Sequence, residues 1–352
     1  MSNPQTELTS PPSDAISSIQ FAPASLRLLV ASWDKSVYLY DTTEAGGRLL
    51  RTYEHRAPVL DVCFGEGDEE AFTGGLDWAV RRLDLDSGAQ TTLSVHEKGV
   101  KCVVYSSAHK LLVSASWDST LHIHHPQSPS QTPATVTLPS KPFSLSLTAT
   151  KLVVAMASRA LHIYDLAQLA SDSAARAQIA SSGEYPVLSV EPWQRRESSL
   201  KFMTRAVACM PNDAGYASGS IEGRVSVEWF DPSDTSQARK YAFKCHRQPS
   251  PEGVDVVYPV NALAFHPVHG TFASGGGDGF VALWDGVAKR RIRQYQKYAA
   301  SVAALSFSGD GKYLAVAISP GFEDGKEGET EGAVSVFVRE LGANEAKGKG
   351  LK

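Results

Sequence analysis

The stretch PVNALAFHPVHGTFASGGGDGFVALWD, from Pro259 to Asp285, contains the pattern that decides the fold. An apolar segment ends in an aromatic residue at Phe265, a segment of small residues follows, and an acidic turn at Asp278 leads to a third segment that ends in Trp284-Asp285. Runs such as FVALWD alternate with a period of two and are rich in β-branched and aromatic residues, which is typical of strands. The stretch therefore predicts three consecutive strands joined by short turns.

The same pattern recurs along the chain about every 41 residues. The other aromatic strand ends are in AISSIQF (Phe21), PVLDVCF (Phe64), GVKCVVY (Tyr105) and SVAALSF (Phe307). The other acidic turns are SWDKS (Asp34), GLDWA (Asp77), SWDST (Asp118) and SIEGR (Glu222), with 43 and then 41 residues between the first three. This period is that of one four-stranded propeller blade. The chain is predicted to be all-β.

Seven units can be counted, so we expect one seven-bladed WD40 β-propeller over residues 1–340. The expected blades are 14–56, 57–97, 98–140, 141–201, 202–257, 258–299 and 300–340. An open ring would expose strand edges, so a strand at 5–11 should close the last blade. The fourth unit has MASRA (156–160) in place of an acidic turn, and the seventh carries an acidic insertion at 320–332. An Ala/Ser-rich segment at 170–183 is predicted to be a mobile loop, and 341–352 a disordered tail.

Composition excludes several classes of function. The 352 residues carry a net charge of −4, which gives no bulk electrostatic reason to bind nucleic acid. The N-terminus lacks an apolar secretory core and no segment is apolar enough to span a bilayer, so we expect a soluble intracellular protein without membrane contact. The four cysteines have no CxxC spacing, which predicts neither disulfides nor a zinc site.

Histidines precede the turn aspartates at a regular distance. In two units the spacing is 22 residues, and in a third it is stretched by an insertion. In WD40 proteins such pairs join a buried hydrogen-bonded network, so we interpret these residues as structural rather than catalytic. The pairs are His55 with Asp77, His96 with Asp118, and His246 with Asp278.

No motif points to an enzyme. GxGxxG, GxxxxGK[ST], HExxH and GxSxG are all absent from the sequence. HIHHP places His122 and His124 on the same face of a strand end, but no third ligand is in view. We therefore expect a solvated blade edge there, and no catalytic residue, metal or cofactor.

The repeat places aromatic and basic residues on one rim of the ring. Trp33 and Trp117 directly precede turn aspartates and Trp78 directly follows one. Such aromatics are good anchors for a bound peptide, although packing against a neighbouring loop is the alternative. Arg224 and Lys244 reach the same rim, and converging cations suit carboxylate or phosphate groups.

Three segments carry a resemblance to a known family. They are QRRESSLKFMTR (194–205), GSIEGRVSVEWFDP (219–232) and KYAFKCHR (240–247). They resemble the spindle-checkpoint Bub-family WD40 propeller, and the likeness covers about residues 14–340. A sister family, the messenger-RNA-export propeller that docks at nuclear pores, usually has RRIESPLK, FTFKCHR and a histidine in place of Glu228. The chain follows the checkpoint family on all three points, whereas HPVHGT also suits the export family.

The resemblance implies a monomeric, non-enzymatic adaptor found in the nucleus and at kinetochores in mitosis. Its implied partners are the GLEBS segments of the checkpoint kinase and its kinase-like relative, and phosphorylated Met-Glu-Leu-Thr repeats of the outer-kinetochore scaffold. By motif match, Arg224 and Lys244 would contact phosphothreonine. Arg205, with Trp33, Trp117 and Trp78 on the rim, would bind the GLEBS segment, whose paired glutamates need cations. The alternative is a messenger-RNA-export adaptor that binds a nucleoporin.

Overall fold

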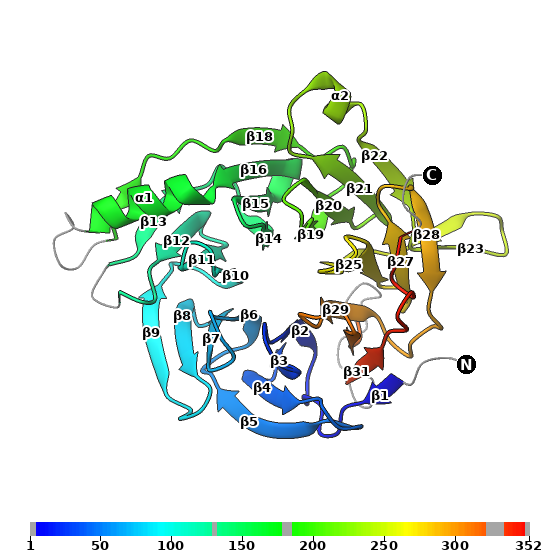
Figure 1. Cartoon of the computed structure of the whole chain (residues 1–352), viewed down its shortest axis with the longest axis horizontal. Coiled ribbons are helices and arrows are strands. Elements are labelled where there is room, and N and C mark those ends of the chain that lie inside the picture. Colours follow the sequence, from blue (N-terminus) through cyan, green and yellow to red (C-terminus); the bar gives the residue numbers. More distant parts are fainter. Residues whose placement is uncertain (1–4, 129–131, 178–184, 322–333, 349–352) are drawn as a thin grey trace.

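The computed structural model describes residues 5–128, 132–177, 185–321 and 334–348. Over these residues the chain forms a ring of seven antiparallel sheets around a central channel (Figure 1). The predicted seven-bladed propeller is thus confirmed. Each blade runs from an inner strand near the ring axis to an outer strand at the edge of the ring, with antiparallel pairing between its four neighbouring strands.

The first three blades follow the repeats closely. Their strands are β2 (Ile16–Phe21), β3 (Arg27–Ser32), β4 (Ser36–Asp41) and β5 (Arg48–Glu54); β6 (Val59–Phe64), β7 (Glu70–Gly75), β8 (Ala79–Asp84) and β9 (Gln90–Val95); and β10 (Val100–Ser106), β11 (Leu111–Ser116), β12 (Thr120–His124) and β13 (Ala134–Thr137). A short strand, β17 (Val187–Leu188), pairs in parallel with β13.

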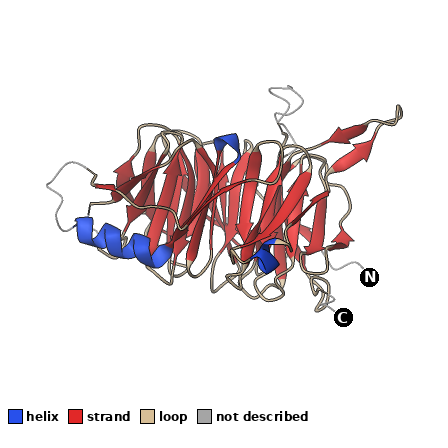
Figure 2. Ribbon diagram, turned by 90° about the horizontal axis from the view of Figure 1, so that it is seen from above, coloured by secondary structure: helices blue, strands red, loops and turns tan. Residues whose placement is uncertain are grey.

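The remaining blades carry the insertions. Their strands are β14 (Pro142–Leu147), β15 (Lys151–Met156), β16 (Ala160–Asp165) and β18 (Gln194–Glu197); β19 (Thr204–Cys209), β20 (Gly215–Ser220), β21 (Arg224–Trp229) and β22 (Tyr241–Lys244); β25 (Val260–Phe265), β26 (Phe272–Gly276), β27 (Val281–Asp285) and β28 (Arg290–Gln294); and β29 (Val302–Phe307), β30 (Tyr313–Ile318) and β31 (Ser335–Glu340). A separate hairpin, β23 (Arg247–Pro249) with β24 (Asp255–Val257), projects from the side of the ring (Figure 2).

The N-terminal strand closes the ring, as predicted. β1 (Gln5–Glu7) pairs antiparallel with β31 as the outer strand of the seventh blade. The following Leu8 is buried and its N–H donates to Val336 O at 2.8 Å. Tyr40, in the first blade, donates its hydroxyl to Ser10 O at 2.7 Å. The first dozen residues therefore connect the last blade to the first.

The inner strands are joined by side-chain hydrogen bonds across blade boundaries. A side-chain oxygen on one inner strand accepts from a backbone N–H on the next, which satisfies donors that would otherwise face the channel unpaired. The acceptors and donors are Gln20 with Phe64 (2.5 Å), Asp61 with Val103 (2.9 Å), Ser144 with Val207 (3.0 Å) and Ser306 with Phe21 (3.0 Å). The last of these crosses the closure between the seventh and first blades.

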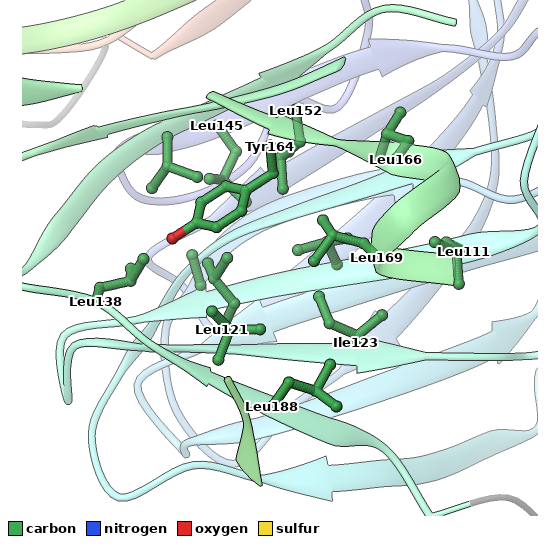
Figure 3. Packing of buried hydrophobic residues seen from close by; sticks show 14 of the residues in the cluster. Leu111, Leu121, Ile123, Leu138, Leu145, Leu152, Tyr164, Leu166, Leu169 and Leu188 are labelled. Atoms are coloured by element: carbon green, nitrogen blue, oxygen red, sulfur yellow. The ribbon is translucent and has the colours of Figure 1, made fainter. Parts of the chain in front are cut away.

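A helix occupies part of the segment that we predicted to be a mobile loop. α1 (Leu166–Ala177) follows β16 and buries Leu166 and Leu169 in the apolar cluster between the third and fourth blades (Figure 3). The loop prediction is therefore wrong for residues 170–177, and 178–183 lie outside the described residues. An alanine-rich stretch has high helix propensity, and two leucines three residues apart suffice to dock its first turn.

The expected disordered tail also differs from the structure over residues 341–348. Leu341 and Ala346 are buried, and Thr271 donates its hydroxyl to Ala346 O at 2.6 Å. Glu345 accepts from the Tyr295 hydroxyl at 2.8 Å and lies 3.1 Å from Arg293 Nη1. The segment thus packs on the sixth blade, and 349–352 lie outside the described residues.

The two irregular units have different outcomes. The MASRA segment, where no acidic turn was expected, forms the 3-10 turn η1 (Ala157–Arg159) between β15 and β16. Most of the acidic insertion, residues 322–333, lies outside the described residues. A one-turn helix, α2 (Asp234–Gln237), follows β21. Among the described residues, no helix is both long and apolar enough to cross a membrane.

Candidate binding surface

The mouth of the central channel is a cavity of about 370 Å³ on the face where the turns between second and third strands lie. We call this cavity the central mouth. Trp33, Trp117 and Arg205 line it, together with Lys101 and Met203. The structure thus brings together three of the four residues that we predicted to bind a GLEBS segment. Every blade contributes at least one lining residue among those described.

The two tryptophans are positioned by their turns. Trp33 follows β3, and its backbone N–H donates to Ala15 O at 2.9 Å. The backbone N–H of Trp117 donates to Gly99 O at 3.0 Å. Both bonds connect a turn to the residue that precedes an inner strand, so the indole rings lie beside the channel. Both side chains are half-buried, which leaves an apolar wall open to a ligand.

Trp78 lies elsewhere. It occupies the equivalent turn of the second blade, has a φ of 69° and is 49% exposed, but it does not line the central mouth. One residue of offset explains the difference, because Trp78 follows the turn aspartate whereas the other two precede theirs. The structure therefore does not join Trp78 to the predicted peptide site.

The central mouth also contains polar groups that the sequence analysis did not single out. Three of its lining residues hold a buried polar atom without a hydrogen-bond partner among the described residues, namely Trp117 Nε1, Thr204 Oγ1 and Asn261 Oδ1. These atoms are closed off from solvent, so they do not by themselves point to a ligand in the cavity. The repeat alignment could have identified Lys101 and Asn261, since GVK and PVN place them at the same position of their inner strands.

The histidine network forms in two of the three predicted units. His96 Nδ1 lies 3.0 Å from Asp118 Oδ2, and His246 Nδ1 lies 2.8 Å from Asp278 Oδ1. Burial raises the pKa of Asp118, but hydrogen bonds from His96 and Thr120 lower it more, so that this pKa lies below its ordinary value. Both pairs connect a loop that precedes an inner strand to the turn of the same blade.

The third predicted pair, His55 and Asp77, does not form a hydrogen bond; each residue has other partners. His55 Nε2 lies 2.9 Å from Thr73 Oγ1, and its Nδ1 lies 3.1 Å from Tyr53 O. Asp77 instead accepts a hydrogen bond from Arg81, four residues later on β8. Burial lowers the pKa of His55, so the ring favours its neutral form. The arginine accounts for the difference, because it gives Asp77 a charged partner on its own strand.

The prediction that His122 and His124 form a solvated blade edge is wrong. Both are 4% exposed, and His122 stacks on His96 with 3.5 Å between ring centroids. Ser94 Oγ lies 3.0 Å from His122 Nδ1. Burial, with His96 nearby, lowers the pKa of His122 to about 3. The described residues contain no group of three side chains suited to hold a metal ion.

Arg224 and Lys244 are brought together as cross-strand partners on β21 and β22. The turn that precedes Arg224 needs Gly223, whose φ is +64° and whose Cβ would lie 2.4 Å from His246 O. Arg224 Nε lies 3.7 Å from Glu222 Oε2, and Lys244 Nζ lies 3.8 Å from Asp255 Oδ2. The Lys244 side chain is 58% exposed, so this pair is open to a ligand from solvent.

Arg247 joins the same group, although the sequence analysis did not single it out. Its Nη1 lies 3.5 Å from Asp255 Oδ2 and its Nη2 donates to Glu222 O at 3.0 Å. We call Arg224, Lys244 and Arg247 the cation cluster. Its members lie at the start of β21, the end of β22 and the start of β23, and the KCHR segment that contains two of them was visible in the sequence.

Comparisons with known proteins agree with this architecture. The WD domain, G-beta repeat family matches residues 2–41, 88–125 and 256–285. The mitotic checkpoint protein BUB3.1 of Arabidopsis thaliana is 46% identical, over 97% of this chain and 94% of that protein. The chain belongs to the Bub3 family of mitotic checkpoint proteins. The family member bub3 of Dictyostelium discoideum is 39% identical over 93% of each chain, and the mRNA export factor GLE2 of Chaetomium thermophilum is 32% identical over 92% of this chain and 86% of that protein.

Glu228 is one of the residues by which the sequence analysis separated the checkpoint family from the export family. This residue is 2% exposed. It accepts from the Tyr216 hydroxyl at 3.0 Å and lies 3.6 Å from Arg196 Nη1 and 3.7 Å from Lys240 Nζ. Arg196 belongs to the RRESSLK segment and Lys240 begins KYAFKCHR. Parts of three family-distinguishing segments therefore meet around the buried Glu228 carboxylate, where a neutral residue would leave two cations poorly compensated.

Proposed function

We propose that this protein is a non-enzymatic mitotic checkpoint adaptor that binds two peptides on one face. The central mouth holds a GLEBS segment, and Arg224 with Lys244 reads a phosphothreonine. The observation that carries the proposal is the pairing of an aromatic-walled cavity with a separate exposed pair of cations. A rigid ring that presents two unlike sites suits an adaptor that joins two partners.

The central mouth fits a segment with apolar and acidic side chains. Trp33 and Trp117 offer flat walls that can bury apolar side chains, and large aromatics often dominate peptide affinity. Lys101 and Arg205 provide positive charge in the same cavity. The two cations suit the paired glutamates that the family resemblance attributes to GLEBS segments.

The Arg224 and Lys244 pair fits a phosphate group. A phosphothreonine carries roughly −1.5 to −2 charges and three acceptor oxygens, so it can accept several charge-assisted hydrogen bonds. Arginine also offers two parallel donors to one phosphate. The ion pairs that these cations make with Glu222 and Asp255 are 3.7 and 3.8 Å long and partly exposed. Such pairs are worth roughly 0–1 kcal/mol, so a phosphate can replace them at low cost.

The partners follow from the family. We infer that the GLEBS segments belong to a checkpoint kinase and its kinase-like relative, and that the phosphothreonine lies in Met-Glu-Leu-Thr repeats of the outer-kinetochore scaffold. The protein would then act in the nucleus and at kinetochores in mitosis. Two of its relatives, from Arabidopsis thaliana and Dictyostelium discoideum, are named mitotic checkpoint proteins, which supports this place of action.

A peptide titration tests the phosphothreonine reader. Calorimetry with a phosphorylated and an unphosphorylated Met-Glu-Leu-Thr peptide should show a clear preference for the first. The double variant Arg224→Ala/Lys244→Ala should lose that preference and keep its affinity for a GLEBS peptide. Rising salt should weaken phosphopeptide binding, because screening acts on exposed charges. A double variant that still prefers the phosphopeptide would place the reader elsewhere on this face.

The export relatives support a second candidate, a messenger-RNA-export adaptor that binds a nucleoporin GLEBS segment. The GLE2 protein is 32% identical over most of this chain. Both candidates use the central mouth, so the partner decides between them. Capture from mitotic and interphase extracts should recover checkpoint kinases under the first proposal and nucleoporins under the second.

A further inference from the structure

The hairpin β23–β24 carries a carboxylate onto the cation cluster. Its two strands leave the ring directly after Lys244 and return just before the sixth blade (Figure 2). Asp255 begins the returning strand and pairs with Pro249 across the hairpin. One oxygen of this residue, Oδ2, lies 3.8 Å from Lys244 Nζ and 3.5 Å from Arg247 Nη1. A single atom of the protein thus faces two cations at once.

Arg247 is the more firmly held of these two cations. Its side chain is 17% exposed, against 58% for Lys244. The hydrogen bond from Nη2 to Glu222 O fixes the guanidinium against the turn that leads to Arg224. The guanidinium is therefore preorganised for an oxygen-rich ligand on the side where Nη1 faces Asp255.

Charge within the cluster is nearly balanced. Among the described residues, Arg224 faces Glu222, and Lys244 and Arg247 share Asp255. Three cations against two carboxylates leave one net positive charge. A ligand with one negative charge interacts with Lys244 and Arg247 about as strongly as Asp255 already does. A phosphate monoester brings more charge and more oxygens, so it can displace that carboxylate.

We propose that Asp255 is a built-in competitor that occupies Lys244 and Arg247 until a phosphate replaces it, and that Arg247 is a third cation of the reader. This inference rests on the proposed reading of phosphothreonine by the same cluster. It adds a consequence for specificity. The site discriminates against peptides with glutamate or aspartate in place of phosphothreonine, because their carboxylates only exchange for the one already present.

The test compares the Asp255→Asn variant with the wild type on three peptides that differ at one position: phosphothreonine, threonine and glutamate. Removing the competing charge should raise the affinity for the phosphopeptide about two- to tenfold, the effect of one or two exposed ion pairs. Binding of the glutamate peptide should rise by a larger factor, because Asp255 offsets nearly all that a single carboxylate can gain, so the ratio of the affinities for the first and third peptides falls. The matched control is Glu252→Gln, which removes the same charge from the loop of the same hairpin.

The outcomes separate this inference from the function on which it rests. If the wild type does not distinguish phosphothreonine from threonine, both fail. Suppose instead that the wild type distinguishes them but Asp255→Asn binds the phosphopeptide no more tightly than wild type or Glu252→Gln. The role of Asp255 as a competitor is then ruled out, while the reading of phosphothreonine stands. Arg247→Gln should weaken phosphopeptide binding several-fold and leave GLEBS binding unchanged. An unchanged phosphopeptide affinity in that variant would remove Arg247 from the reader.

Discussion

His246 and Asp278 lie 2.8 Å apart, Nδ1 to Oδ1, and their contact joins the loop after the fifth blade to a turn of the sixth. His246 Nε2 lies 2.9 Å from Ser274 Oγ, and both the histidine and the aspartate are buried. A chain of buried polar side chains of this kind is fully paired only in one arrangement of the loop and the blade.

The first prediction follows from that chain. Asp278→Ala leaves the buried His246 Nδ1 without its partner, so the free energy of unfolding should fall by about 1–3 kcal/mol. Urea unfolding followed by circular dichroism measures it. Asp86→Ala removes a turn carboxylate whose side chain is 67% exposed, and it should stay within about 0.5 kcal/mol of wild type. Equal losses in the two variants would argue against the buried network.

The second prediction concerns acid. The pKa of His122 is about 3 in the folded protein, because burial disfavours the charged ring, whereas an unfolded histidine has a pKa of roughly 6.5. Below pH 6.5 the His122 ring binds a proton in the unfolded state but stays neutral in the folded state. Stability is therefore lost as the pH falls, by about 1.4 kcal/mol per pH unit from this group.

The His122→Gln variant tests this assignment. Glutamine stays neutral, so the variant should lose stability less steeply than wild type between pH 6 and pH 4. Denaturant unfolding at several pH values gives both slopes. His109→Gln is the control, since this histidine lies at an exposed hydrogen bond to Ala149 O. If the slope of His122→Gln equals that of wild type, the folded ring titrates normally.

The third prediction concerns the closure of the ring. Deleting residues 1–12 removes β1 and Leu8 and exposes the edge of β31. The melting temperature should fall by about 5 °C or more, since a buried leucine alone contributes roughly 1.5–3 kcal/mol. A full deletion that melts like the wild type would contradict this closure.

The fourth prediction separates the three turn tryptophans. Trp33→Ala and Trp117→Ala should each weaken binding of a GLEBS peptide by about 2 kcal/mol or more, as buried anchors do. Trp78→Ala is the matched control, because Trp78 occupies an equivalent turn but lies outside the central mouth. Calorimetry measures all three affinities, and circular dichroism checks the fold. Wild-type affinity in both of the first two variants would exclude the central mouth.

The fifth prediction concerns the C-terminal segment. Deleting residues 341–352 removes the buried Leu341 and Ala346 and leaves Arg293 and Arg339 without Glu345. The melting temperature should fall by several degrees, about what 1–2 kcal/mol produces in a chain of this size. A shortened protein that retains the wild-type melting temperature would show that the segment contributes nothing to stability.

The blade pattern could be predicted because its signals lie within one short segment of sequence in most blades. Period-two strands, the aromatic residue that ends five of the seven inner strands, and the acidic turn of most units are all readable within about thirty residues of sequence. The closing strand was predictable from the edge that an open ring would expose. The positions of Trp33 and Trp117 at the channel follow from the same register.

Other features depend on contacts between distant segments. His122 was expected at a solvated edge, but Ser94 and His96, from the preceding repeat, cover it. The α1 helix gains its anchor from a core formed by two blades, which alternation within one blade does not reveal. Asp255 reaches Lys244 and Arg247 only because a hairpin returns it to them, and no local motif marks that return.

The composition of the central mouth has a thermodynamic consequence. Its described lining residues come from all seven blades, so the cavity has its full set of contacts only when the whole ring is closed. A ligand that binds there stabilises the closed ring by an amount that grows with the logarithm of its concentration relative to its Kd. Damage to any blade, even one far from Trp33 or Arg205 in sequence, should therefore appear as a loss of affinity before it appears as unfolding. Peptide occupancy in turn links separate blades into one cooperative unit, so the partner helps to preserve the shape that recognises it.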